Sequence, residues 1–382
     1  MRAERADRDG AAATVRDDAA TLVALSEQLH AHPETAWEEH RSSRWVAESL
    51  DDAGFDVTPG YLGLDTAFHA TYGSGPFRLG LCAEYDALPG LGHACGHNLI
   101  SAITVGAARA LAPLADAAGL TIEVYGTPAE EGGGGKIELL ERGAFAGLDL
   151  AMMAHPAPVD VAEAEPFAVS HSHVTYRGRA SHAAAYPEQG VNAADAFTVA
   201  QVAVGLLRQQ LPSTVRVHGV MTNGGEAPNA IPARTDGRWY VRAESLDQLA
   251  RTEAKVWRCF EAGALATGCD LTIEPESKPY AEFRTDRGAL EAYVANAERL
   301  GRVFDTGSPA RRMNRASTDM GNVSQVVPAI HPYVGIGSLP ALNHQPEFAA
   351  HCVGGDAERA LLDAATALAW TALDVAAERG AS

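Results

Sequence analysis

The sequence predicts an α/β fold with a second, smaller α+β domain inserted into it. Three short apolar runs, at 77–82, 120–125 and 148–153, have the pattern of strands, and helical segments at 99–111 and 136–142 lie between them. This alternation of strand and helix is typical of a layered domain with a largely parallel sheet. Ligands bind beyond the carboxyl ends of the strands in such sheets, so the residues that follow these runs are candidates for a functional site.

From about Phe167 the pattern changes to strand, helix, strand, strand, helix, strand, which is the order of a small α+β sandwich. The earlier pattern returns after about Phe283 and ends with a helix at 357–377. The smaller domain is therefore expected to be an insertion. We expect the following organisation: a tail at 1–14, a first segment of the main domain at 15–168, the inserted domain at 169–284 and a second segment of the main domain at 285–382.

Composition excludes several classes of protein. Of 382 residues, 46% are hydrophobic, and 30 basic against 49 acidic residues give a formal net charge of −19. No basic stripe is present to contact phosphates and no run of apolar residues is long enough for a membrane span, so we expect neither a nucleic-acid nor a membrane partner. The five cysteines are odd in number and widely spread, and no secretory signal is readable, so we expect a cytoplasmic protein.

The first candidate cluster follows the predicted strand at 77–82 and contains Cys95 and His97. Residues two positions apart would point to different faces of a helix, whereas a loop that turns at Gly96 can direct thiolate and imidazole toward one metal ion. The same residues also suit a cysteine nucleophile with a histidine base. This cluster alone leaves both interpretations open.

The second cluster, Glu130 and Glu131, follows the predicted strand at 120–125. Neighbouring side chains of an extended backbone point in opposite directions, so one carboxylate could bind a cation while the other faces a water held by that cation. Two solvated loop glutamates are the plain alternative. A phosphate-binding loop is excluded, because Lys136 is followed by Ile137 and not by Ser or Thr.

Two further histidines extend the pattern. His155 follows the predicted strand at 148–153, and His344 lies in the last third of the chain. Each alone is weak evidence of a ligand. Together with the two clusters, however, they place Cys, His, Glu and His at three strand ends, with another His in the returning segment. This convergence predicts a metal site.

Several motifs occur in order along nearly the whole chain. They are His30-Ala31-His32-Pro33-Glu34 with Glu38-Glu39, the stretch 84–98, Glu130-Glu131, the stretch 178–184, Asn229-Ala230-Ile231-Pro232 with Arg242 thirteen residues beyond Asn229, and the stretch 316–321. With these motifs the sequence resembles the dinuclear metallopeptidases and amidohydrolases that include carboxypeptidase G, aminoacylase and the plant auxin-conjugate hydrolases. The stretch 84–98 is most similar to aminobenzoyl-glutamate hydrolase subunits and to a dipeptidase acting on β-alanyl-lysine. Relatives in the amino-acid-conjugate branch usually have Asp at the positions of Glu84 and Asn98.

The resemblance implies a three-layer metallopeptidase catalytic domain with an inserted α+β sandwich that acts as lid and dimerisation domain. It implies two divalent metal ions per subunit, zinc or manganese, with cobalt or nickel as alternatives. The implied ligands are Cys95, His97, Glu131, His155 and His344. The implied catalytic residues are Glu130 as general base, Asp86 as the residue that orients a ligand, and His182, which stabilises the oxyanion in the partner subunit's site. The implied substrate-binding residues are Asn229 and Arg242, whose guanidinium suits a carboxylate.

We therefore expect a homodimeric, metal-dependent amidohydrolase. Its expected substrates are small N-acyl or N-aminoacyl amino acids, including aminobenzoyl-glutamate-like conjugates, whose amide bond is attacked by a metal-activated water. A dipeptidase acting on free-amine dipeptides is the alternative within enzymes. A metal-binding regulatory protein without turnover is the alternative from another class, and Glu130 beside Glu131 argues against it, because a pure binding site needs no base.

Overall fold

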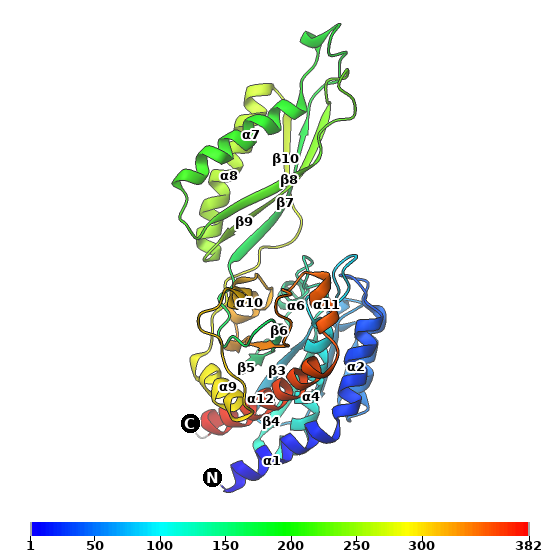
Figure 1. Cartoon of the computed structure of the whole chain (residues 1–382), viewed down its shortest axis with the longest axis vertical. Coiled ribbons are helices and arrows are strands. Elements are labelled where there is room, and N and C mark those ends of the chain that lie inside the picture. The colour runs from blue at the N-terminus through cyan, green and yellow to red at the C-terminus, as the bar shows by residue number, and fades with distance from the viewer. Residues whose placement is uncertain (1, 381–382) are drawn as a thin grey trace. The chain divides into compact units, whose positions relative to one another are not determined.

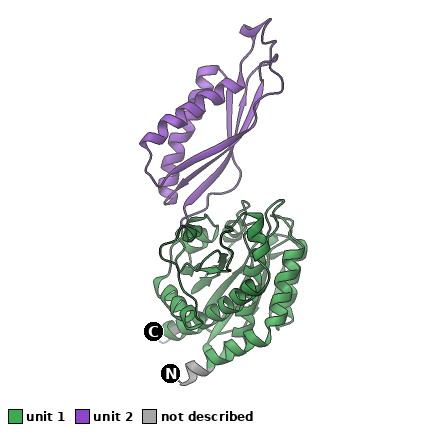
Figure 2. Cartoon of the chain, viewed as in Figure 1, with its two compact units in different colours: residues 1–165, 283–382 green, residues 166–282 purple. Residues whose placement is uncertain are grey.

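Figure 1 shows the computed structural model, which describes the backbone of residues 2–380 and the side chains of residues 7–379. The chain forms two compact units, coloured separately in Figure 2. Unit 1 consists of Met1–Glu165 and Phe283–Ser382, and unit 2 is Pro166–Glu282. Each unit has a hydrophobic core of its own, so the inserted unit buries its apolar residues without help from the rest of the chain.

A six-stranded mixed sheet forms the centre of unit 1. In spatial order its strands are β1 (Asp56–Pro59), β2 (Phe68–Tyr72), β4 (Leu120–Gly126), β3 (Phe77–Ala83), β5 (Leu150–Met152) and β11 (Ala329–Ile330). The last four pair in parallel, whereas β1 and β2 are antiparallel to their neighbours. A separate parallel pair consists of β6 (His155–Ala157) and β12 (Tyr333–Gly335).

Helices cover both faces of this sheet. Leu150 and Met152 of β5 belong to the core cluster that contains the residues of α4 and α12, whereas Ala151 between them packs with residues of α6 and α10. Alternate strand residues point to opposite faces, so the unit has three layers, as predicted. The helices of unit 1 are α1 (Arg2–Asp17), α2 (Ala19–Ala31), α3 (His40–Asp51), α4 (His97–Leu111), α5 (Ala115–Ala118), α6 (Gly135–Glu141), α9 (Arg287–Arg299), α10 (Met320–Ser324), α11 (Pro346–His351) and α12 (Gly355–Gly380).

Two helical stretches of unit 1, His97–Ala118 and Gly355–Arg379, are long and apolar enough to cross a membrane by length and composition. Most of each stretch is buried inside the unit. Helix α4 packs against β3, α2 and α12, and α12 also packs against α9. Both stretches are therefore accounted for as core helices of unit 1.

Helix α1 (Arg2–Asp17) stands where we expected a tail at 1–14. Val15 is buried in the core that α12 also lines. The indole Nε1 of Trp370 donates a hydrogen bond to the carbonyl oxygen of Arg8 at 2.8 Å. The alanine-rich segment is therefore helical because α12 gives it an apolar partner, and such tertiary packing leaves little trace in local periodicity.

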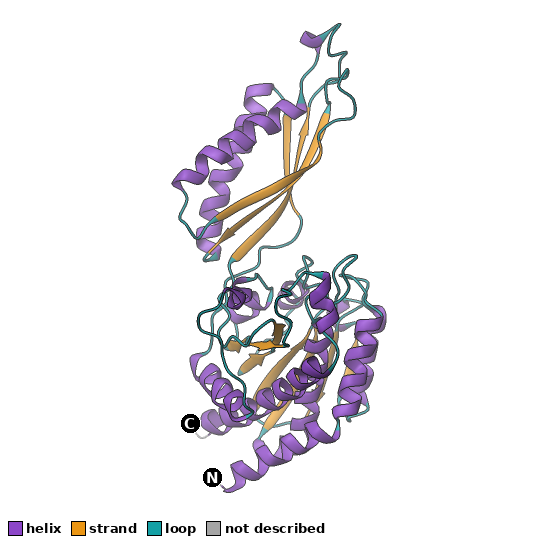
Figure 3. Cartoon of the chain, in the orientation of Figure 1, coloured by secondary structure: helices purple, strands orange, loops and turns teal. Residues whose placement is uncertain are grey.

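Unit 2 is a four-stranded antiparallel sheet with two helices packed on it (Figure 3). Its elements follow the predicted order: β7 (Ala168–Arg177), α7 (Ala193–Leu207), β8 (Arg216–Asn223), β9 (Arg234–Ala243), α8 (Leu246–Thr267) and β10 (Asp270–Pro275). The spatial order is β10, β7, β9, β8, so β8 and β10 are the edges. The predicted α+β sandwich is confirmed.

The parallel strands of unit 1 place the candidate site residues. Strands β4, β3 and β5 are neighbours in the sheet and run in the same direction. The segments that follow them contain Glu130, Cys95 and His155, respectively. Three segments far apart in the sequence therefore meet at one edge of the sheet, as the strand pattern predicted.

Across β2, β3 and β4, a group of polar side chains surrounds the carboxylate of Glu123. His69 Nε2 lies 3.0 Å from Glu123 Oε2, the Tyr125 hydroxyl donates to the same oxygen at 2.7 Å, and Arg78 Nε donates to Oε1 at 2.7 Å. Burial alone would raise the pKa of Glu123, but these hydrogen bonds and the charge of Arg78 hold it at about 2. The ionised form of Glu123 is thus favoured in the folded state.

We expect Glu123→Gln to lower the free energy of unfolding at neutral pH. A folded-state pKa below the usual 4.5 means that the stabilisation is present above pH 4.5 and is lost as the pH falls toward 2. The expected loss is about 2 kcal/mol, allowing for solvent around the Arg78 guanidinium. Urea unfolding of both proteins between pH 2 and 7 measures it. A gap that stays constant across this pH range would contradict the assignment.

Candidate metal centre

The loop between β3 and α4 turns at Gly96, where φ is +88°. A Cβ at this position would lie 2.9 Å from side-chain atoms of Pro156, so only glycine fits there. The turn leaves Cys95 Sγ 3.5 Å from His155 Nε2 and starts α4 at His97. Thiol and imidazoles from separate segments therefore face one another, as a metal site requires.

The turn after β4 positions the two adjacent glutamates. Ala129 has a left-handed backbone, with φ +55°, and its N–H donates to the buried carboxylate of Glu39 at 2.8 Å. Glu130 and Glu131 each place a carboxylate oxygen in one group with a ring nitrogen of His97, within 4.8 Å of one another. The expectation that their side chains point in opposite directions is wrong, because this segment is a turn and not an extended strand.

Asp86 connects two of the predicted ligands. His97 Nδ1 lies 2.8 Å from the carbonyl oxygen of Asp86 and 3.1 Å from its carboxylate Oδ1. The other carboxylate oxygen, Oδ2, accepts a hydrogen bond from the Glu131 N–H at 2.9 Å. Because Nδ1 donates to Asp86, the Nε2 atom of His97 is left as the ligand atom.

The remaining two histidines come from other loops. His155 begins β6, its Nδ1 lies 2.8 Å from the carbonyl oxygen of Pro156, and burial and the neighbouring His331 lower its pKa to about 3. It is therefore neutral, the state in which imidazole binds metals. His344 is half-exposed, and its Nε2 lies 3.2 Å from Glu131 Oε1.

All five residues predicted as metal ligands lie together in unit 1, with Glu130 beside them. In each of three overlapping groups, the ligand atoms lie within 4.8 Å of one another: Cys95, His97 and His155; Cys95, Glu131 and His344; His97, Glu130 and Glu131. Cys95, His97 and Glu131 each belong to two groups. A donor shared between neighbouring groups is suited to a pair of ions rather than to one ion.

The chemistry of these donors fits divalent metal ions. Two buried ligand atoms, His97 Nε2 and Glu131 Oε1, make no hydrogen bond of good geometry among the described residues, although His344 Nε2 lies 3.2 Å from the latter. Burial and the charge of Glu131 raise the pKa of the Cys95 thiol well above its usual value. A divalent ion would satisfy the orphaned atoms and favour the thiolate, and a set of S, N and O ligands is suited to zinc or manganese.

Glu130 has the properties of a proton acceptor. It is buried, and burial together with the charges of Glu84, Glu131 and Asp319 raises its pKa well above the usual value of 4.5. A carboxylate with a raised pKa can both accept and release a proton near neutral pH.

The other three predicted site residues lie in unit 2, in two separate places. His182 pairs with Ala230 in a β-bridge, and the N–H of Ala183 donates to the carbonyl oxygen of Asn229 at 2.9 Å, so the loops of His182 and Asn229 are adjacent. These loops lie at the end of the sheet where β9 begins. Arg242 lies near the other end of β9, about 26 Å along the strand at 3.3 Å per residue. The structure brings His182 and Asn229 together, but not Arg242.

Arg242 lies among residues that the sequence did not single out. Its Nε lies 3.4 Å from His218 Nε2, and the rings of His171 and His218 pack edge-on against Tyr240 on the same sheet. Burial lowers the pKa of Arg242, which remains a strong base. Alternate residues of a strand lie on the same face of the sheet, so this spacing along β7, β8 and β9 was the sequence signal that could have predicted the group.

Three further residues near the ligand cluster were missed as well. Glu39, Lys136 and Asp319 are fully or almost fully buried polar residues. Glu39 and Asp319 fall within or next to the recognised motifs, but nothing in the sequence shows which buried atoms they contact. Lys136 was considered only as part of a phosphate-binding loop, which it does not form.

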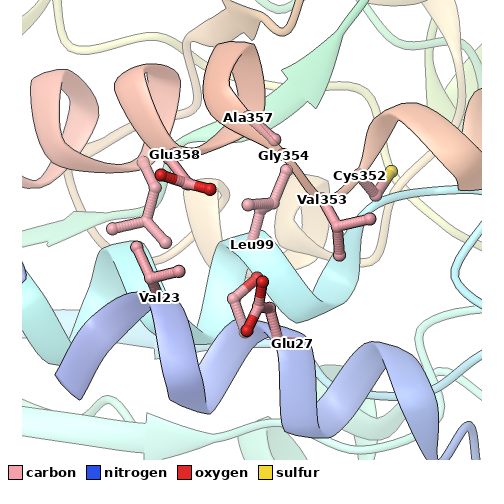
Figure 4. A pocket seen from close by; sticks show the side chains of 10 residues that line it. Val23, Glu27, Leu99, Cys352, Val353, Gly354, Ala357 and Glu358 are labelled. Carbon is pink, nitrogen blue, oxygen red and sulfur yellow. The ribbon is translucent and has the colours of Figure 1, made fainter. Parts of the chain in front are cut away.

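A small pocket lies between α2, α4 and the start of α12 (Figure 4). It is lined by Val23, Ser26, Glu27, Leu99, Cys352, Val353, Gly354, Ala357, Glu358 and Leu361. None of the predicted site residues contributes to it. Its walls are mostly aliphatic, and the two glutamates do not form a converging set of polar groups of the kind that orients a ligand.

Comparison with known proteins identifies the family. Residues 76–369 match peptidase family M20/M25/M40. The chain belongs to this family. It is 43% identical over 380 residues to the Xaa-Arg dipeptidase of Mus musculus, covering 96% of this chain and 88% of the mouse protein. It is 32% identical over 271 residues to one of the subunits of p-aminobenzoyl-glutamate hydrolase from Escherichia coli, covering 65% of this chain and 56% of the bacterial one.

Solved structures share the fold. The aminobenzoyl-glutamate utilization protein of Klebsiella pneumoniae superimposes with a TM-score of 0.73 at 21% identity, covering 94% of this chain and 97% of that one. YXEP of Bacillus subtilis, described as a dinuclear metal binding peptidase from the M20 family, superimposes with a TM-score of 0.70 at 21% identity, covering 95% and 99%. The predicted architecture, a three-layer catalytic unit with an inserted sandwich, is confirmed.

Family membership decides between several of the alternatives. The M20 metallopeptidase is a hydrolase, as the sequence predicted. This family membership favours a metal-dependent enzyme over a cysteine hydrolase or a regulatory protein without turnover. Relatives that are 42% and 43% identical to the chain are dipeptidases, whereas the aminobenzoyl-glutamate hydrolase chain is 32% identical, so the comparisons favour the dipeptidase alternative over the expected N-acyl amidohydrolase.

We expect Glu39→Ala to destabilise the turn that carries Glu130. The substitution leaves the buried N–H of Ala129 without its acceptor, at a cost of about 1–3 kcal/mol in the free energy of unfolding. Glu39→Gln keeps an acceptor oxygen and is the matched control, with a smaller expected loss. Urea unfolding of the metal-free proteins measures both. Equal stabilities for Glu39→Ala and Glu39→Gln would show that the hydrogen bond does not hold the turn.

Proposed function

We propose that the protein is a dinuclear metal-dependent dipeptidase that cleaves unblocked dipeptides with a C-terminal arginine. The observation that carries this proposal is the 43% identity to the mouse Xaa-Arg dipeptidase along 96% of the chain. Hydrolysis of N-acyl amino acids or aminobenzoyl-glutamate-like conjugates is the second candidate. Its support comes from the lower identity of 32% to the aminobenzoyl-glutamate hydrolase chain of Escherichia coli along 65% of the chain.

In this proposal, two divalent ions are held by the ligands named above, Cys95, His97, Glu131, His155 and His344. Zinc and manganese are the first candidates, and cobalt and nickel are alternatives. When bound, such ions would supply Lewis acidity, which lowers the pKa of a bound water molecule and polarises the carbonyl group of the scissile amide.

Glu130 would act as the general base and then as a general acid. Its carboxylate accepts a proton from the attacking water and delivers it to the leaving amine. The raised pKa of Glu130 suits both steps. Asp86 is a positioning residue. One of its carboxylate oxygens contacts His97 Nδ1, and the other accepts a hydrogen bond from the backbone N–H of Glu131.

The substrate-binding residues are proposed to come from two copies of unit 2. Arg242 would bind the substrate carboxylate in a bidentate pair, Asn229 would contact the substrate, and His182 would stabilise the oxyanion. His182 and Asn229 lie at the opposite end of the sheet from Arg242. One copy of unit 2 therefore spreads these residues over about 26 Å, far more than a dipeptide spans. A second copy that supplies the loops of His182 and Asn229 solves this problem.

Unit 2 also has a surface suited to a homodimer. Strand β8 is an edge strand, and Val220 on it is 59% exposed. Val202 and Leu206 of α7 are 60% and 70% exposed. An open sheet edge next to exposed aliphatic side chains favours pairing with a second copy.

We expect dipeptides of the Xaa-Arg type to be cleaved and their C-terminal amides to be poor substrates, because the amides lack the carboxylate for Arg242. A mass-spectrometric assay of Xaa-Arg dipeptides, the matching amides, N-acetylated forms and aminobenzoyl-glutamate measures this preference. Cleavage of blocked substrates alone would overturn the dipeptidase proposal in favour of the amidohydrolase.

Glu130→Gln should keep its metal ions but lose roughly 100- to 10,000-fold in kcat, whereas Cys95→Ala should lose metal as well.

We expect mixed dimers of two inactive variants to regain activity. In a dimer of a His182→Ala subunit and a Glu130→Gln subunit, one site receives both defects and the other receives neither, if His182 acts in the partner's site. Random exchange should restore about a quarter of wild-type activity, because half of the dimers are mixed and each has one intact site. Glu130→Gln mixed with itself is the control. No recovery, with exchange shown by native mass spectrometry, would place His182 in its own subunit's site or outside catalysis.

A further inference from the structure

Lys136 is a fully buried lysine behind the ligand cluster. Its Nζ lies 2.5 Å from Glu84 Oε1 and 2.7 Å from Asp319 Oδ1, and both carboxylates are fully buried as well. The backbone N–H of Lys136 donates to the other oxygen of Asp319 at 2.9 Å. Asp319 therefore holds both the side chain and the backbone of the first turn of α6.

These carboxylates also form a group with Glu130. One oxygen each of Glu84, Glu130 and Asp319 lies within 4.8 Å of the others, close enough to hold a cation. The group differs from the other three because an ammonium already contacts two of its members. Burial alone would lower the pKa of Lys136, but Asp319 and Glu84 raise it well above its usual value, so the cation is permanent.

The residue type suits this position. Arginine greatly outnumbers lysine in this chain, whose lysines are Lys136, Lys255 and Lys278. An ammonium is compact and has three donors around one atom, whereas a guanidinium is a wide planar fork. The compact group fits between two buried carboxylates in the way that a metal ion would.

Glu84 connects the lysine to the ligand cluster. While Glu84 Oε1 contacts Lys136, its Oε2 lies 3.5 Å from His97 Nε2. Removal of the ammonium would leave up to three like charges within 4.8 Å and no cation between them. Repulsion would then move Glu84 and Glu130 from their positions, or draw in another cation.

We propose that Lys136 is a positioning residue whose buried ammonium takes the place of a divalent ion between Glu84 and Asp319 and thereby holds Glu130 beside the metal ligands. The inference rests on the proposed role of Glu130 as base. The inference adds that Lys136 keeps metal ions away from the carboxylates of Glu84 and Asp319, which lie next to that base.

The test compares Lys136→Met with the charge-balanced double variant Lys136→Met/Asp319→Asn, and uses the exposed Lys255→Met as matched control. Three quantities are measured: manganese bound per chain after dialysis against Mn²⁺, thermal unfolding of the chelator-treated protein, and kcat and KM on whichever substrate the wild type cleaves. The first two need no substrate, so they remain informative if the proposed substrate class is wrong.

For Lys136→Met we expect one more Mn²⁺ per chain than in the wild type, a lower unfolding midpoint without metal, and a 10- to 1,000-fold lower kcat with KM within threefold. The double variant should lose the extra ion and recover part of the unfolding midpoint. Lys255→Met should match the wild type in all three. Wild-type kcat and manganese content in Lys136→Met would overturn the proposal. Lys136→Met alone could fail to fold. In that case, a double variant that also fails to fold overturns the proposal, and a double variant that folds supports it.

Discussion

The rest of the site depends on the neutralisation of buried negative charge, because unit 1 buries several carboxylates within a few ångströms of one another. A carboxylate out of water is tolerated only when a cation or several donors compensate it. On one side of Glu130 the compensation comes from Lys136, which is part of the chain. On the other side it would fall to the divalent ions that the donor set fits. Glu130, the proposed general base, lies between these two sources of positive charge.

Much of the fold, and the gathering of the candidate site residues, could be predicted from sequence for a physical reason. Parallel strands buried on both faces have continuous apolar runs, and the polar residues after each run must emerge at one edge of the sheet. Cys95, Glu131 and His155 were found in this way, since they follow β3, β4 and β5. The contacts of Asp86 with His97 and the Glu131 backbone also agree with the role expected of it.

What the sequence did not reveal depends on tertiary contacts. The left-handed backbone of Ala129 is held by Glu39, ninety residues earlier in the chain, and it turns Glu130 and Glu131 to the same side. Helix α1 requires the apolar side of α12. Lys136 carries no local signal of burial, because its partners lie on segments more than fifty residues away in each direction. The sequence pattern predicts which helices and strands form, but it does not show which buried charged residues contact one another.

The residues of unit 2 that are proposed to act on the substrate lie near its two ends, and this separation bears on the proposed assembly of the enzyme. A rigid antiparallel sheet keeps Arg242 and the loops of His182 and Asn229 apart by roughly the length of β9, near 26 Å. No local loop movement closes such a distance while the ladder of β7, β8 and β9 remains paired. If all three residues serve one substrate, they must therefore come from different copies of the chain. The length of a strand, more than any single contact, is thus the argument for the proposed dimer.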